Sequence, residues 1–170
     1  SNASKDFMTP DDELEEKQKR DSYIETGNIL HALFASMQNK DDINRAIDQL
    51  EFDGVLYNKP MTRQQLKKYI EKELEDCQIA NWFLPEMKVF NECSILFYDT
   101  EIGQVREQRP DRVIYNDNEI TVIDFKTGRE LARHQQQVRE YMSLLHSMGY
   151  KNISGYLWYI QQHNIVKVEL

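Results

Sequence analysis

The first half of the chain repeats its apolar residues at the three- and four-residue spacing of α-helices. Three helices are predicted on this basis, over 22–39, 41–50 and 62–76, and a charged run over 11–19 is interpreted as an exposed helix start. Asp41 or Asp42 can cap the second helix, and Thr62, just after the break at Pro60, can cap the third. The N-terminal half is therefore predicted to be helical.

Beyond Pro85 the apolar positions alternate as they do in β-strands. Strand regions are predicted over 87–98, 105–115 and 120–126, and a closing hairpin over 153–160 and 165–170. Between them lies a predicted helix over 131–148, which Gly149 ends as the C′ residue. Its apolar stripe consists of Val138, Tyr141, Met142, Leu145 and Met148. We expect the helix to pack on the 105–126 hairpin through Val138, Met142 and Leu145.

Length and composition favour one α/β domain, alone or with an appended subdomain. The 170 residues are 40% hydrophobic and include 7 Phe, 9 Tyr and 2 Trp, enough for a real core. We assign residues 4–84 to a helical N-terminal part and 85–170 to the core, and interpret residues 1–3 (Ser-Asn-Ala) as a tag remnant. No apolar run approaches the roughly 20 residues of a membrane span, and there is no signal peptide, so we expect a cytoplasmic protein without membrane contact.

Charge and cysteine content restrict the classes of function. The chain has 21 Lys and Arg against 29 Asp and Glu, a net charge of −8. A free-standing nucleic-acid binder is more often basic, so such a function needs a local positive path or a larger parent protein. Acidic residues gathered around a metal would also give this balance. Cys77 and Cys93 cannot complete a four-cysteine zinc or iron–sulfur site, and we expect both to be buried and reduced.

The stretch RPDRVIYNDNEITVIDFKTG, residues 109–128, carries the candidate chemistry. Asp124 and Lys126 lie two apart on a strand and share a face, while Phe125 points the other way. A hairpin over this stretch would fold Asp111 back beside them. Two buried carboxylates repel each other unless a cation neutralises them, and Mg²⁺ or Mn²⁺ prefers such oxygen ligands. The metal would activate a water and shield a phosphate, while the lysine stabilises developing charge.

Taken alone, an acidic-x-Lys tripeptide is more often a surface ion pair. The chain contains two others, at 15–17 and 86–88, and neither has the same kind of upstream acidic partner at a strand end. The preceding Pro110-Asp111, the hairpin spacing and the apolar lead-in at 120–123 favour the catalytic interpretation.

These residues resemble the PD-(D/E)xK nuclease superfamily, whose restriction-endonuclease-like core is α-β-β-β-α-β with a mixed sheet. Three further segments resemble the RecB/AddA-type nuclease domain at the C-terminus of bacterial UvrD/Rep-like helicase–nucleases. They are TGNILHALF (26–34), VFNECSI (89–95) and QQVREYMSLL (136–145). Each motif is weak alone, but five in the right order are fairly specific.

The resemblance implies a role for each site residue. Asp111, Asp124, the Phe125 carbonyl and His31 would bind the metal, and Lys126 would position the water or the phosphate. Glu92 would lie near the site and bind a second metal or a metal-bound water, with Glu86 as its competitor. Four residues would orient the site or touch DNA: Gln137, Tyr141, Arg109 and Thr127. Without the motifs, a lone helical histidine, an exposed strand glutamate and a core tyrosine would be the simpler interpretations.

The resemblance also implies a context. It points to a Mg²⁺-dependent deoxyribonuclease, with Mn²⁺ as an alternative and exonuclease action expected over endonuclease action, in bacterial DNA recombination and double-strand-break repair. Partners would be DNA, helicase motor domains upstream in the same chain, and a second helicase–nuclease subunit. The sequence contains no G-x-x-x-x-G-K-[ST] loop, so no ATP site is expected, and His134, His146 and His163 receive no role. Two alternatives stay open: an inactive nuclease-fold scaffold that guides DNA or docks a partner, and a stand-alone repair or restriction-type endonuclease.

Overall fold

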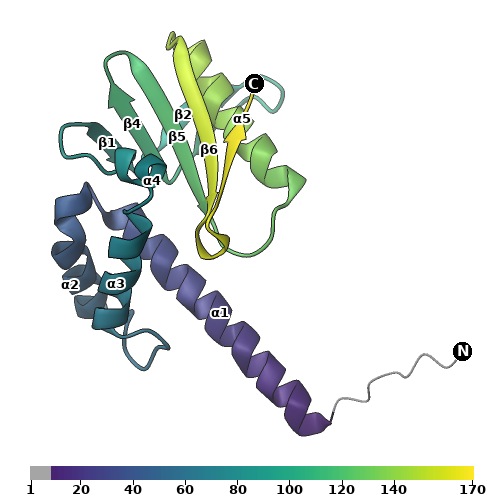
Figure 1. Cartoon of the computed structure of the whole chain (residues 1–170). Coiled ribbons are helices and arrows are strands. Elements are labelled where there is room, and N and C mark those ends of the chain that lie inside the picture. The colour runs from purple at the N-terminus through teal and green to yellow at the C-terminus, as the bar shows by residue number, and fades with distance from the viewer. Residues whose placement is uncertain (1–8) are drawn as a thin grey trace, which may run out of the picture.

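The computed structural model describes residues 9–170, so the presumed tag residues 1–3 lie outside the described residues. Its centre is a five-stranded mixed sheet of order β1-β4-β5-β6-β7, and β2 and β3 form a separate two-stranded ribbon. Figure 1 shows the helices of the N-terminal half on one side of the sheet and α5 on the other. The predicted architecture of a mixed α/β sheet with a helical N-terminal flank is confirmed.

The helices are α1 (Pro10–Ser36), η1 (Lys40–Asp42), α2 (Ile43–Phe52), α3 (Arg63–Glu73), α4 (Cys77–Asn81), α5 (Ala132–Ser147) and η2 (Ile160–Gln162). The strands are β1 (Lys88–Asn91), β2 (Ile95–Asp99), β3 (Gln104–Gln108), β4 (Arg112–Asn116), β5 (Glu119–Lys126), β6 (Asn152–Tyr159) and β7 (Asn164–Val168). The charged run and the first predicted helix are thus one helix, α1. Thr62 caps α3 through a capping box with Gln65, as expected of a threonine before a helix.

Two predicted strand regions are each divided in the structure. The region 87–98 breaks after Asn91, where Glu92 takes a positive φ of 46°. The region 105–115 breaks between β3 and β4, where Pro110 has no N–H for a ladder. Alternation of apolar residues cannot show either break, so the prediction of two long strands was wrong in this respect, and the predicted 105–126 hairpin is narrower, spanning only β4 and β5.

The β4–β5 hairpin is closed by a two-residue turn. Asp117 and Asn118 both have positive φ, of 47° and 67°, as a type I′ turn requires. The strands pair in antiparallel register from Asn116 opposite Glu119 to Arg112 opposite Ile123. β5 then pairs in parallel with β6, after the chain has crossed over through α5.

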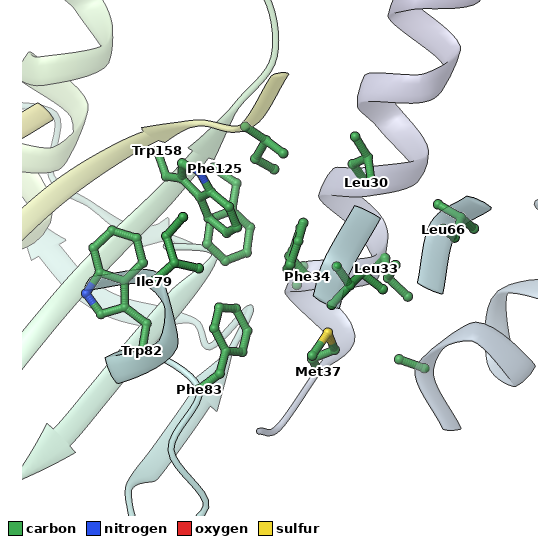
Figure 2. Packing of buried hydrophobic residues seen from close by; sticks show 14 of the residues in the cluster. Leu30, Leu33, Phe34, Met37, Leu66, Ile79, Trp82, Phe83, Phe125 and Trp158 are labelled. Carbon is green, nitrogen blue, oxygen red and sulfur yellow. The ribbon is translucent and has the colours of Figure 1, made fainter. Parts of the chain in front are cut away.

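Alternating residues of the sheet bury its two faces against different helices. Ile114, Ile123, Phe125 and Trp158 share a core with α1, α2, α3 and α4. Figure 2 shows α1 inside this core, with Phe34 on the side of Phe125 and Trp158 and Leu33 on the side of Leu66. The ring centroids of Phe34 and Trp158 are 4.6 Å apart. The helix α1 therefore forms one wall of the main core.

The opposite face is covered by α5, which does not sit where it was expected. Leu145, together with Tyr141, packs on the β4–β5 hairpin, but Val138 and Met142 pack on β6 and β7 instead. Gly155 in β6 makes this possible, because a Cβ there would lie 2.4 Å from the Met142 sulfur. Met148, predicted to lie on the same stripe, is exposed.

Both cysteines in the described part are free, but neither is buried as expected: Cys77 is exposed and Cys93 is half-buried. Among the helices of residues 9–170, none has the length and apolar character needed to cross a membrane.

Candidate active site

The register of the β4–β5 hairpin brings the two aspartates together. Because Arg112 pairs with Ile123, the next position in the same register places Asp111 opposite Asp124. The Phe125 amide donates a hydrogen bond of 2.8 Å to Asp111 Oδ2, which fixes the carboxylate at the end of the sheet. Two residues 13 positions apart thus share one site because the turn between them has only two residues.

His31 reaches this site from α1. Its Nε2 lies 3.2 Å from Asp111 Oδ2, and its ring makes an edge contact with Phe125, with centroids 5.8 Å apart. Gly27, one turn earlier, allows the helix to approach. A Cβ at Gly27 would lie 2.8 Å from the Thr127 methyl carbon and 2.5 Å from Gln161 Oε1. Thr127, just after β5, therefore packs on α1 and helps to set the distance between helix and hairpin.

Asp111 and His31 stabilise each other's charged forms. Burial opposes the charge on His31, but the hydrogen bond to Asp111 and the charges of Asp111, Asp124 and Glu92 outweigh it and raise the pKa of the imidazole. Burial likewise opposes the charge on Asp111, but hydrogen bonds from His31 and Asp124 prevail and hold its pKa below the usual value. Asp111 is therefore the ionised member of the aspartate pair.

Asp124 behaves in the opposite way. Its side chain is 4% exposed, and burial, followed by the hydrogen bond and charge of Asp111, raises its pKa to about 7. Lys126 Nζ lies 2.7 Å from Asp124 Oδ2, yet that oxygen makes no hydrogen bond of good geometry. A buried carboxylate oxygen without a hydrogen-bond partner is a group that would accept a cation.

Helix α5 holds Lys126 from the other side. Lys126 Nζ donates a hydrogen bond of 2.8 Å to Gln137 Oε1, so the ammonium is shared between Gln137 and Asp124. Tyr141, one turn further along, is 2% exposed, and burial together with the charges of Asp124 and Asp111 raises its pKa. Of the two roles expected of Tyr141, orienting the site is therefore the one that its position supports.

Glu92 and Arg109 lie beside Asp111 on the outer rim. The Glu92 amide donates to the Asp111 carbonyl at 3.0 Å, and Arg109 Nε donates to the Glu92 carbonyl at 2.9 Å. Glu86, the competitor of Glu92, precedes the far end of β1, where Lys88 pairs with Tyr115. Position thus favours Glu92. Both Glu92 and Arg109 are exposed, and the charge of Glu92 acts on His31.

The candidate ligand atoms of this site suit a hard divalent cation, although they are not yet arranged in a complete coordination shell. Asp111, Asp124 and the Phe125 carbonyl offer oxygens, and His31 offers an imidazole nitrogen, which are the groups that Mg²⁺ or Mn²⁺ sites use. Within residues 9–170, no three His, Cys, Asp or Glu side chains are already spaced to hold a metal ion. Asp124 Oδ2 is buried and faces Lys126 without a well-formed hydrogen bond, and this oxygen and the high pKa of its carboxyl both fit a site that gains from a cation.

Two buried polar residues near the site were not anticipated. Arg112, directly after Asp111, is fully buried, although nothing in the alternation of β4 distinguishes it from a surface strand residue. His134, which received no role, is 9% exposed and its Nδ1 lies 2.9 Å from the Tyr159 hydroxyl. Burial, followed by the charges of Lys126 and Arg133, lowers the pKa of His134, so it lies in α5 as a neutral partner of Tyr159.

A mixed sheet with an acidic pair and a lysine at the end of its hairpin defines a nuclease-type α/β fold. The chain belongs to the PD-(D/E)XK nuclease superfamily, whose family model matches residues 7–169. Membership confirms the expected restriction-endonuclease-like fold.

Among solved structures, the chain is similar to one described as "Crystal structure of SSO0001", with 18% sequence identity and a TM-score of 0.39. The match covers 84% of this chain and 66% of that one, so the chain spans just under two thirds of that protein's length. No curated protein matches the chain.

Proposed function

We propose that the chain is a Mg²⁺-dependent deoxyribonuclease domain that hydrolyses phosphodiester bonds. The observation that carries the proposal is the meeting of His31, Asp111, Asp124 and Lys126 at one end of the β4–β5 hairpin. A catalytically inactive scaffold has no physical need for Asp124, a buried carboxyl beside Asp111 whose ionisation destabilises the fold, as its raised pKa indicates. The cluster therefore favours a catalyst over the scaffold alternative.

Each residue of the site has a distinct task in this proposal. Asp111, Asp124, the Phe125 carbonyl and His31 hold the metal, which when bound supplies a water of lowered pKa and neutralises phosphate charge. Lys126, kept in place by Gln137, presents an ammonium where negative charge develops on the phosphate. Glu92, exposed on the rim beside His31, is placed to bind a metal-bound water or a second ion.

We further infer the context of a RecB/AddA-type helicase–nuclease acting in bacterial recombination and repair, in the cytoplasm. The motifs in order along the chain support it, and so does the net charge of −8, because upstream motor domains would supply the DNA grip that an acidic domain lacks. Exonuclease action and a second helicase–nuclease subunit belong to the same inference. A stand-alone endonuclease would share the chemistry and differ in these partners.

The test compares two charge-removing variants with one control variant on linear DNA. Asp124→Asn removes a ligand charge and should abolish cleavage, whereas Glu119→Gln, on the exposed start of the same strand, should leave it intact. Lys126→Met should keep metal binding but lose roughly 2.7–4 kcal/mol of transition-state stabilisation, a rate loss of about 10²–10³. EDTA should stop the reaction, and Mg²⁺ or Mn²⁺ should restore it. Unchanged cutting by Asp124→Asn would show that this cluster does not carry the activity, and a wild-type chain that does not cut would leave the scaffold hypothesis standing.

A further inference from the structure

Arg112 is a fully buried arginine that no step of the proposed chemistry uses. It begins β4, one residue after Asp111, and has no exposed surface. Arginine is almost never fully buried unless it is paired, so the contacts of its guanidinium need an explanation. Those contacts lie on three other segments of the chain.

The guanidinium binds backbone carbonyls in place of a carboxylate. Nη1 donates to the Met37 carbonyl, Nη2 to the Gln38 carbonyl at 2.6 Å, and Nε to the Trp82 carbonyl at 2.9 Å. Nη1 also donates to Asn91 Oδ1 at 3.0 Å, and the Asn91 amide donates to the same Met37 carbonyl at 3.0 Å. The central guanidinium carbon of Arg112, Cζ, lies 4.1 Å from the Phe83 ring centroid, which is a cation–π contact.

The Met37 and Gln38 carbonyls directly follow α1, which ends at Ser36, and Met37 is the C-cap of the helix in an extended conformation. A helix leaves its last carbonyls without partners and carries partial negative charge there. The last turn of α1 contains no basic residue, and the positive charge near this helix end comes from Arg112 in β4 and from Arg45 in α2. In the described part of the chain, no carboxylate forms an ion pair with Arg112, and the helix end takes that place.

We infer that Arg112 is a positioning residue for the proposed metal site, holding His31 against Asp111 by tying the end of α1 to the start of β4. The inference rests on the proposed function only for its catalytic consequence. Met37 is the C-cap of α1, six residues after His31 and about 9 Å from it along the helix axis, and Arg112 is bonded directly to Asp111. One side chain thus sets the relation between two candidate ligands that lie 80 positions apart.

The planar fork of arginine is what this arrangement requires. Three carbonyls and an amide oxygen receive donors in fixed directions, which a lysine ammonium on a flexible stem cannot reproduce. Arg112→Lys should therefore keep the positive charge but weaken the link between the end of α1 and the start of β4. Groups that orient the ligands of a metal typically change its affinity by about 10- to 100-fold, and that is the loss we expect.

Arg45 offers a matched control. Its Nη2 donates to the Ser36 carbonyl at 2.8 Å, so it also caps the end of α1, but it lies on α2, is half exposed and does not reach β4. Arg45→Lys removes the same kind of cap without cutting the link to Asp111. If Arg112 were only a helix cap, the two variants would behave alike.

The experiment measures geometry and metal binding without DNA. In the full chain, nuclear Overhauser effects between the His31 and Phe125 rings should be strong in the wild type and in Arg45→Lys, and weak in Arg112→Lys. Titration with Mn²⁺ alone should show the 10- to 100-fold weaker affinity only in Arg112→Lys. In a His31→Ala background, Arg112→Lys should add little further loss, because both changes remove the same ligand. Asn91→Ala, which removes one contact of the tie, gives a smaller loss in the same direction and serves if Arg112→Lys does not fold.

Three results would overturn the inference: an unchanged His31–Phe125 contact in Arg112→Lys, equal losses in Arg45→Lys, or full additivity with His31→Ala. Failure of the proposed function has a different signature. A chain that neither cuts DNA nor binds Mn²⁺ would reject the metal site, while the ring contacts would still report whether Arg112 positions His31.

Discussion

Asp124 is a carboxyl group placed where folding alone would favour a neutral side chain. Burial and the neighbouring Asp111 raise its pKa from 3.8 to about 7, so the folded chain prefers the protonated form. A group whose pKa is raised on folding stabilises the protein fully below its unfolded pKa, and that contribution is lost as the pH rises through the folded pKa. Without metal, stability should therefore fall between about pH 4 and pH 7 because of this residue.

Asp124→Asn should remove this pH dependence, because an amide resembles the protonated acid in shape and charge. At pH 8 without metal, we expect the variant to be more stable than the wild type, with a ceiling of about 4 kcal/mol from roughly three pKa units at 1.36 kcal/mol each. At pH 4 the difference should nearly vanish. Urea unfolding at both pH values measures it.

Metal provides the complementary observation for Asp124. Mg²⁺ at 100 times its dissociation constant should stabilise the wild type at pH 8 by about 2.7 kcal/mol, and the Asp124→Asn variant far less. Glu119→Gln, on the exposed start of β5, is the control and should follow the wild type throughout. If the free energies of unfolding of the wild type and of Asp124→Asn changed equally from pH 4 to pH 8, the raised pKa of Asp124 would be contradicted.

Gln137 is the second residue with a separable task. Its Oε1 accepts from Lys126 at 2.8 Å, and it touches neither aspartate in the contacts described above. Gln137→Ala should lower kcat by roughly 10- to 100-fold, since a hydrogen bond to a charged group contributes about 1.5–3 kcal/mol, and should leave Mn²⁺ affinity unchanged. Gln136→Ala, its exposed neighbour, should behave as the wild type. Equal losses of Mn²⁺ affinity and rate in Gln137→Ala would place Gln137 in the metal site instead.

At the scale of elements, α1 has two functions at once. Its apolar side forms a wall of the main core, and one turn of it carries His31 to the hairpin. Gly27 lies where these functions meet, because the helix passes against Thr127 and Gln161 at that point. The helix approaches the end of β5 closely at Gly27, where the absence of a Cβ leaves room for the side chains of Thr127 and Gln161.

Gly27→Ala tests the close contact between α1 and Thr127, because helix propensity and side-chain packing predict opposite effects of this substitution on stability. In an exposed helix, replacing glycine with alanine stabilises by about 1 kcal/mol. Here the added Cβ would collide with Thr127 and Gln161, and overpacking of this kind costs roughly 1–3 kcal/mol. We therefore expect lower stability in urea and weaker Mn²⁺ binding, with Asn28→Ala, on the exposed side of the same helix, as the control. If Gly27→Ala were more stable than the wild type and bound Mn²⁺ equally well, the contact of Gly27 with Thr127 and Gln161 would have room for a methyl group.

The elements also show how far the sequence could predict the molecule. Periodicity found α1, α2, α3, α5 and the hairpins, because these depend on local spacing and on turn residues. It missed the two strand breaks, since the positive φ of Glu92 leaves no trace in an alternating pattern. It also misplaced half of α5, because the choice between β5 and β6 depends on the space above Gly155.

The residues of the site also differ in how far they could be predicted, according to whether their partners are local or distant in the sequence. Asp111, Asp124 and Lys126 could be predicted together, because a hairpin register is a local property. Arg112 could not, since its partners Met37, Gln38 and Trp82 lie 30 to 75 positions away and are backbone carbonyls with no residue signature. The role of Gln137 as the partner of Lys126 also needed the three-dimensional arrangement of α5.

At the scale of the whole molecule, the distribution of charge matters more than its sum. The net charge is −8, and the N-terminal part of α1 contributes to it with Asp11, Asp12, Glu13, Glu15 and Glu16. Residues 9–21 are all exposed, and Figure 1 shows this end of α1 extending away from the sheet. If the chain acts on DNA as proposed, these acids would oppose its approach through long-range repulsion rather than through contacts in the site.

Ionic strength should consequently change cleavage in two directions. The screening length is about 30 Å at 0.01 M salt and about 10 Å at 0.1 M, so moderate salt removes the distant repulsion first. We expect the cleavage rate of the isolated chain to rise from 10 to 100 mM NaCl and to fall beyond, whereas a basic nuclease would only lose affinity. Asp11→Asn, Glu13→Gln, Glu15→Gln and Glu16→Gln together change the net charge from −8 to −4 and spare the Asp12 that completes the capping box of α1. This variant should cut faster at 10 mM salt and reach its maximum at a lower salt concentration. A rate that falls steadily with salt in the wild type, or a salt optimum that the variant does not move, would show that the distant acids do not oppose DNA approach.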